Sequence, residues 1–169
     1  RLPKFFYFHQ YDSLPGRIDL IDLQAKAKNG NITGPERTAL SLLQLAGVKG
    51  GELSTDEFEK RISELEAAGN EITNQVFRYW TQNRDLIVDF IGDSQTIRTP
   101  NGQDVVHRFV DLRLRDLRHQ MTTNFETRST GFQWFFSFIA AFSEFEGDRS
   151  VIILLDEPGL GLHARAQQD

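Results

Sequence analysis

Two adjacent carboxylates, Asp156 and Glu157, are the side chains of this sequence best placed to do chemistry, because they directly follow the unbroken apolar run 151–155. Such a run, rich in branched residues, is typical of a central strand buried on both faces of a parallel sheet. Ligands of open α/β sheets bind at the carboxyl ends of such strands. Because successive side chains of a strand alternate in direction, one acid can hold a metal ion while the other acid points to a different part of the binding site. The competing interpretation is an acidic loop with both carboxylates solvated.

A second candidate lies upstream, where Ser129, Thr130 and Gly131 begin a predicted helix over 132–145. Backbone N–H groups and the helix dipole at such a start can bind an anion. The same residues also make an ordinary helix cap. The helix, the apolar strand and a further helix beginning near residue 162 form an α/β unit, which predicts an α/β fold class.

The preceding elements have clear periodicities. The aromatic segment 5–8 predicts a short strand, and Thr33-Gly34-Pro35-Glu36 predicts the start of a helix of about three turns that Gly47 ends. A heptad-like apolar stripe then spans 58–80, which indicates either one long helix with a weak point at Gly69-Asn70 or two helices hinged there. We interpret it as a helical subdomain packed on its neighbour rather than as a mobile lid. The residues of this stripe are Phe58, Ile62, Leu65, Gly69, Ile72, Val76 and Trp80.

From Leu86 the apolar period changes to two, and Pro100-Asn101-Gly102 marks a turn before a second alternating segment that ends near Leu114. Two antiparallel strands are predicted. One face of the second strand carries Arg113 and Arg115 together with Asp111. Because acids interleave the arginines, a solvated face with cross-strand ion pairs is favoured over a phosphate-binding face.

Composition limits the function classes. With 39% hydrophobic residues and 14 Phe among 169 residues, the chain can bury a core, and its densest apolar run is far shorter than the ~18–20 residues of a membrane span. It has no Cys, which excludes disulfides and thiolate metal sites and fits a cytoplasmic location. The net charge of −5 argues against binding polyanions through overall charge. The four His have no metal-binding spacing, and there is no Gly-x-Ser-x-Gly nucleophile motif.

The order of these motifs resembles ABC-type ATPases, in which a signature motif, a helix, a Walker B strand and a D-loop follow one another. Two segments of the sequence are similar to the AAA/OLD-like group of bacterial ATP-binding proteins, relatives of the RecF and SMC heads. They are Ser-Thr-Gly-Phe-Gln-Trp-Phe-Phe-Ser-Phe at 129–138 and Leu-Leu-Asp-Glu-Pro-Gly-Leu-Gly-Leu-His-Ala at 154–164. The segments Phe-Phe-Tyr-Phe at 5–8 and Leu-Pro-Gly-Arg-Ile at 14–18 also resemble this group. The resemblance covers about half the chain, chiefly from residue 122 onward.

The resemblance implies a partial P-loop NTPase fold in three parts: a strand and turn of the ATPase head over 1–17, a helical insert over 18–84, and half of the ATPase core over 85–169. It implies that the cofactors are ATP and Mg²⁺ and that ATP drives a head-to-head dimer of the protein with itself. It also implies a role in DNA processing or phage defence, with DNA contacted through other domains or partners, and no membrane partner.

When the roles of the family's motif residues are assigned to the matching positions of this sequence, the resemblance implies that Asp156 is the Walker B residue near Mg²⁺ and that Glu157 is the catalytic base. Thr130 and Gly131 become signature contacts to the γ-phosphate of ATP held by the second protomer, with Gln133 close by. His163 takes a D-loop position where transporter-type proteins have Asp.

One expected motif is missing, since Gly-x-x-x-x-Gly-Lys-Ser/Thr occurs nowhere in the sequence. We therefore expect the chain to be part of a longer protein whose phosphate-binding loop lies upstream, and we expect this chain alone not to hydrolyse ATP. Two alternatives remain open. Gly-x-Gly-x-x-Ala at 159–164 fits a dinucleotide-binding fingerprint, although two acids stand between it and the strand. The chain could also be an ATPase-derived interaction module without activity.

Overall fold

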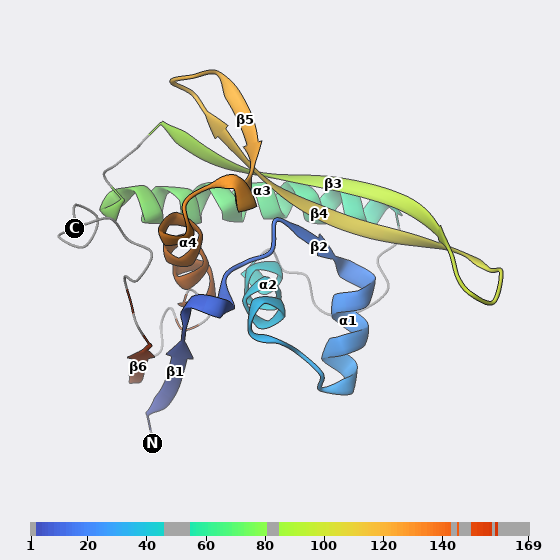
Figure 1. Cartoon of the computed structure of the whole chain (residues 1–169), viewed down its shortest axis with the longest axis horizontal. Coiled ribbons are helices and arrows are strands. Elements are labelled where there is room, and N and C mark those ends of the chain that lie inside the picture. The colour runs from blue at the N-terminus through green and yellow to red at the C-terminus, as the bar shows by residue number, and fades with distance from the viewer. Residues whose placement is uncertain are drawn as a thin grey trace.

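The computed structural model describes residues 3–45, 55–80, 85–142, 145, 150–156 and 158. Two sheets organise these residues, a parallel pair and a larger antiparallel sheet (Figure 1). The parallel pair consists of β1 (Lys4–Phe8) and β6 (Val151–Leu155). The antiparallel sheet has the order β2-β4-β3, with β5 also paired to β4; its strands are β2 (Arg17–Asp19), β3 (Leu86–Arg98), β4 (Asp104–Asp116) and β5 (Met121–Asn124).

Within the described ranges, four α-helices and two short 3₁₀ segments connect and cover the sheets. They are α1 (Leu20–Asn29), α2 (Gly34–Leu45), α3 (Thr55–Tyr79), α4 (Thr130–Phe142), η1 (Gln10–Asp12) and η2 (Phe125–Thr127). The α/β class expected from the sequence is confirmed. None of the helices in the described ranges is long and apolar enough to cross a membrane.

The β3–β4 hairpin forms as the alternating pattern predicted, and its tip extends beyond the body of the molecule (Figure 1). Gly102 takes a positive φ of 79° in the connecting turn, a conformation that glycine adopts at little cost. The opposite, charged face carries cross-strand ion pairs, in which Arg115 contacts Asp89 and Arg17 contacts Asp111. The prediction of a solvated, ion-paired face is therefore confirmed.

The heptad-like stripe forms one continuous helix of 25 residues, α3, which runs alongside the hairpin (Figure 1). Every residue of the stripe is buried, because this side of α3 packs on the apolar face of β3 and on α4, where Trp80, just after the helix, contacts the ring of Phe132. Gly69 lies against the ring of Phe90, and a Cβ at this position would overlap the ring. Gly69 thus permits close packing of helix on strand, and α3 is one helix without a hinge at Gly69-Asn70.

The start of α2 follows the predicted capping pattern. The Glu36 carboxylate accepts hydrogen bonds from the backbone N–H and the hydroxyl of Thr33, both at 2.8 Å, and from Lys26 Nζ at 2.7 Å. These donors lower the pKa of Glu36 from its ordinary 4.5 to about 2, Lys26 contributing most. The predicted helix end at Gly47 lies outside the described residues.

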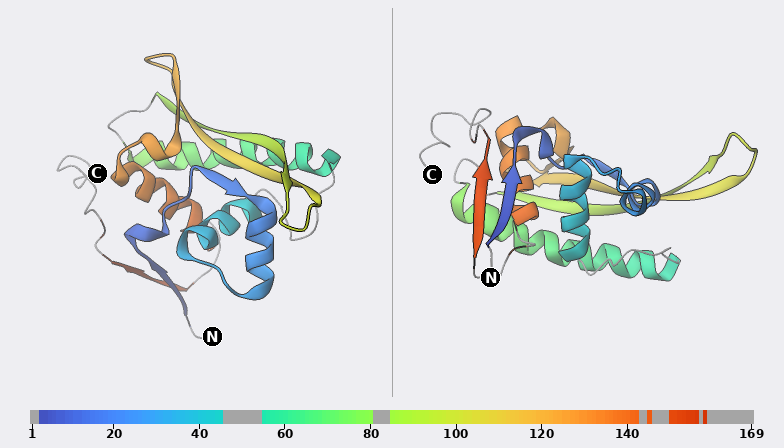
Figure 2. Two further views of the ribbon diagram at one scale, coloured as in Figure 1. Left: turned by 45° about the vertical axis from the view of Figure 1, so that its right-hand side comes forward. Right: turned by 90° about the horizontal axis from the view of Figure 1, so that it is seen from below.

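Helix α4 is buried on two sides, because it lies between two apolar clusters formed by the described residues. Phe132 and Phe136 belong to the larger cluster with the antiparallel sheet and α3, whereas Trp134 and Phe138 pack with the aromatic residues of β1. Figure 2 shows α4 between α3 and the β1–β6 pair. The aromatic composition of α4 therefore joins the parallel pair to the rest of the fold.

Candidate functional site

Strand β6 forms and pairs in parallel as predicted, but it is not a central buried strand. Among the described strands it pairs with β1 alone, and its residues Ile152–Leu155 are between 38% and 47% exposed. The prediction of burial on both faces is therefore wrong for the described chain. The physical reason is that α4 covers one face of the pair, mainly over β1, while no described element covers the other face or the outer edge of β6.

The orientation of α4 on β1 decides which ends come together. The ring of Phe8, at the carboxyl end of β1, contacts Trp134 in the second turn of α4, at 5.8 Å between centroids. Phe6, earlier in the strand, contacts Phe142 at the end of α4, also at 5.8 Å. Helix and strand are therefore antiparallel. The N-terminus of α4 and the carboxyl ends of both parallel strands lie at the same end of this unit (Figure 2).

Asp156 lies immediately after β6 at this end. Its backbone N–H donates to the carbonyl of Phe8 at 3.2 Å, which extends the pairing of the strands by one step. Its carboxylate Oδ2 accepts a hydrogen bond of 3.1 Å from the hydroxyl of Tyr7. This hydrogen bond is the main cause that raises the pKa of Tyr7, with smaller contributions from desolvation and from the negative charges of Asp156 and Asp12.

The Asp156 carboxylate suits a role as one ligand of Mg²⁺. It is exposed, and within the described ranges only Tyr7 is seen to bind it, through Oδ2. Mg²⁺ typically keeps several waters and takes one or two protein carboxylates together with substrate phosphates. The described residues contain no group of three or more His, Cys, Asp or Glu side chains that could form a complete protein cage. Asp156 therefore fits a metal held jointly with a nucleotide.

Thr130 and Gly131 occupy the first positions of α4. Ser129 precedes them, and its Oγ accepts from the N–H of Phe132 at 3.4 Å, as a helix cap does. Thr130 is exposed, whereas Gly131 is buried. The structure thus places an exposed hydroxyl residue at a helix N-terminus, on the same end of the unit as Asp156.

The side-chain amide of Gln133 makes hydrogen bonds within the chain. Its amide nitrogen donates to the carbonyls of Glu126 at 3.1 Å and Arg128 at 2.7 Å. Both donors of the amide are therefore directed at the segment that leads into α4. Gln133 fixes the position of the residues before Thr130. Glu157, His163 and the glycine pattern at 159–164 lie outside the described residues.

Two contacts that the sequence did not reveal attach the segment after β1 to this site. The N–H of Leu14 donates to the buried Ser137 Oγ of α4 at 2.8 Å, and the N–H of Gly16 donates to Glu126 Oε1 at 2.7 Å. The two parts of the chain that carry the family resemblance thus contact one another. The contact of Tyr7 with Asp156 has no signal in the sequence either, because the two residues are 149 positions apart and only the strand register brings them together.

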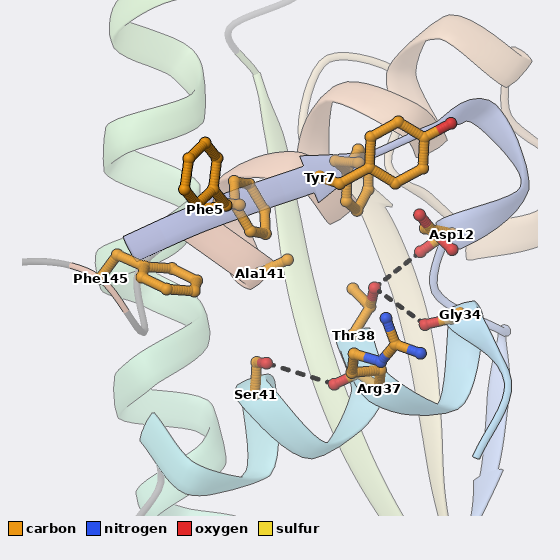
Figure 3. Close-up of a pocket in the computed structure, with 11 residues that line it drawn as sticks. Phe5, Tyr7, Asp12, Gly34, Arg37, Thr38, Ser41, Ala141 and Phe145 are labelled. Carbon is orange, nitrogen blue, oxygen red and sulfur yellow. Dashed lines mark hydrogen bonds between the residues drawn. The ribbon is translucent and has the colours of Figure 1, made fainter. Parts of the chain in front are cut away.

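A hollow of about 250 Å³ lies beside β1, between this strand and α2 (Figure 3). Arg37 and Asp12 line its polar part, and Phe5 and Phe145 line its apolar part. Thr38 is held at its wall by hydrogen bonds to the carbonyls of Asp12 and Gly34. Neither Asp156 nor Thr130 is among the lining residues, so we do not assign the candidate catalytic site to this hollow.

Comparison of the chain with protein-family models, with curated proteins and with solved structures finds no match. The assignment of function therefore depends on the motifs and on the geometry described above.

Proposed function

We propose that this chain supplies the signature and Walker B half of an ABC-type ATPase head, within a protein that hydrolyses Mg-ATP as a head-to-head dimer. The observation that carries the proposal is the shared end of the α4–β6 unit. The exposed N-terminus of α4 at Thr130 lies at this end, and so does the carboxylate of Asp156, which suits a role as one ligand of a metal ion. A helix N-terminus favours phosphate, and the carboxyl end of a parallel strand is where such ligands bind.

Each residue has a stated role in this proposal. Asp156 holds Mg²⁺, which when bound neutralises the charge of the phosphates. Glu157 accepts the proton of the attacking water. The exposed start of α4, at Thr130, contacts the γ-phosphate of the nucleotide on the partner, while the burial of Gly131 does not support a direct contact by that residue. His163 belongs to the D-loop.

Gln133 has a different role from the one that the resemblance implied. Because its amide nitrogen already donates to two backbone carbonyls, we propose that it sets the position of the signature residues instead of contacting nucleotide. The hydrogen bonds of Ser137 and Glu126 to the segment after β1 support the same arrangement. The start of α4 is thereby fixed from two directions, which favours a preorganised contact.

The exposure of β6 does not support the proposal. A strand of five apolar residues at the centre of a P-loop fold is covered on both faces, and here it is not. The proposal therefore requires that a further segment, which also brings the phosphate-binding loop, pair with β6. The assignment of the helical region as an insert stays a prediction.

The test uses the longer protein that joins this chain to a phosphate-binding loop. Glu157→Gln should retain ATP binding, because the amide keeps the size of the side chain and loses only its basicity. Hydrolysis should fall by ~10²–10⁴-fold, the usual contribution of a positioned base. Asp156→Ala should in addition weaken Mg²⁺-dependent nucleotide binding, measured by calorimetry with and without Mg²⁺.

The chain of residues 1–169 alone serves as the matched control. It should bind Mg-ATP much more weakly than the longer protein, since the loop and its Lys provide most of the phosphate affinity. Unchanged hydrolysis by Glu157→Gln would contradict its role as base. Micromolar Mg-ATP binding by residues 1–169 alone would contradict the requirement for a separate phosphate-binding loop.

A further inference from the structure

The hydroxyl of Tyr7 is placed on Asp156 by the register of the parallel strands. Tyr7 of β1 pairs with Leu154 of β6, and Asp156 follows two residues later on the same face. Side chains two residues apart along a strand lie on the same face of the sheet, so a long aromatic side chain on the paired strand can extend toward the next residue of that face. The result is the 3.1 Å hydrogen bond from Tyr7 Oη to Asp156 Oδ2.

A second contact supports the ring of Tyr7. It makes an edge-on contact with the ring of His9, at 5.7 Å between centroids. His9 is in turn fixed by the 3₁₀ segment η1, because its Nδ1 accepts from the N–H of Tyr11 at 3.0 Å and its own N–H donates to Asp12 Oδ2 at 3.1 Å. Asp12 is buried. A chain of contacts thus leads from the body of the protein through His9 to the hydroxyl of Tyr7.

We propose that Tyr7 is a positioning residue for Asp156. The Tyr7 hydroxyl binds carboxylate oxygen Oδ2, and the other oxygen, Oδ1, would bind a divalent cation. This inference rests on the proposed function, because it assumes that Asp156 holds the cation of a metal–nucleotide complex. Partners that hydrogen-bond a ligating carboxylate restrict its orientation, and their loss typically costs 10–100-fold in metal affinity. Asp156 is exposed, so without Tyr7 its side chain would rotate among several rotamers.

The test measures metal binding directly, without relying on turnover. In the longer protein saturated with the non-hydrolysable analogue adenylyl imidodiphosphate, the dissociation constant of Mn²⁺ is measured from the EPR signal of free Mn²⁺. Tyr7→Phe keeps the ring and its contact with His9 and removes only the hydroxyl. We expect it to weaken Mn²⁺ binding about tenfold while the affinity for metal-free analogue stays unchanged.

Two controls separate positioning from general structural damage. Tyr11→Phe removes a hydroxyl from an exposed ring of the same segment and should leave Mn²⁺ affinity unchanged. In an Asp156→Ala background, Tyr7→Phe should have no further effect on Mn²⁺ binding, because the carboxylate through which it acts is absent.

The possible results are distinct. If the unmodified protein binds Mn²⁺ with the analogue and Tyr7→Phe binds it equally well, the positioning role of Tyr7 is wrong and the proposed ATPase function stands. If the unmodified longer protein binds no Mn²⁺–analogue complex, the proposed function itself is wrong, and the role of Tyr7 fails with it. Equal losses in Tyr7→Phe and Tyr11→Phe would likewise overturn a specific role for Tyr7.

Discussion

Gly69 of α3 lies directly against the Phe90 ring of β3, and this contact sets how closely the long helix approaches the antiparallel sheet. Phe90 is fully buried, so its ring has little room to move. The position therefore tolerates no Cβ, although it lies in the middle of a helix, where glycine is otherwise unfavourable.

Gly69→Ala should destabilise the protein, in contrast to the usual effect of this change in a helix. Helix propensity favours Ala by about 1 kcal/mol, but overpacking a filled core costs about 1–3 kcal/mol. We expect a lower midpoint of urea unfolding for Gly69→Ala and little change for Asn70→Ala, its exposed neighbour. A Gly69→Ala variant that is more stable than the unmodified chain would show that α3 does not pack as described.

Ser137→Ala should destabilise the protein by about 1–3 kcal/mol, because the N–H of Leu14 would be left in a buried place without its acceptor. The measurement is the free energy of unfolding from urea titration. Ser94→Ala, an exposed position in β3, is the matched control and should change this free energy by less than about 0.5 kcal/mol. Equal stabilities of the two variants would contradict the contact between Leu14 and α4.

The pH dependence of stability should contain a contribution from Glu36. Its pKa is lowered from 4.5 to about 2 in the folded chain, so its stabilisation is complete above the unfolded value and is lost as the pH falls from about 4.5 toward 2. Glu36→Gln should therefore be less stable than the unmodified chain at pH 6. The difference should shrink toward pH 2, where the carboxyl group is itself becoming neutral.

Urea titrations at several pH values measure this difference. Glu66→Gln, on the exposed side of α3, controls for the loss of one negative charge. A difference between Glu36→Gln and the unmodified chain that stays constant from pH 6 to pH 2 would contradict the capping role of Glu36.

Thr130→Arg tests the proposed action of the signature residues across a dimer. In the longer protein the variant should bind nucleotide on its own phosphate-binding loop within about twofold of the unmodified affinity, since Thr130 is proposed to act on the partner's nucleotide. ATP-driven dimer formation, measured by analytical ultracentrifugation, should be lost. Thr122→Arg adds the same charge at an exposed position of β5 and should still dimerise. Normal dimer formation by Thr130→Arg would remove the signature assignment.

Local periodicity determined most of the secondary structure of this protein. The heptad-like stripe predicted the buried side of α3, the alternating segments predicted the β3–β4 hairpin, and Thr33 with Glu36 predicted the start of α2. These features depend on residues close in sequence, whose side-chain direction follows from the helical or extended repeat. The sequence also placed Asp156 directly after a strand and Thr130 at a helix start, as the structure shows.

Only the tertiary structure decided how these elements meet. The sequence could not reveal that Gly69 is needed for close contact, because Phe90 approaches it from another element. It could not reveal the exposure of β6, since an apolar run indicates what a strand can bury and not which elements are present to cover it. The Tyr7–Asp156 hydrogen bond likewise depends on strand register, which is set by contacts between residues far apart along the chain.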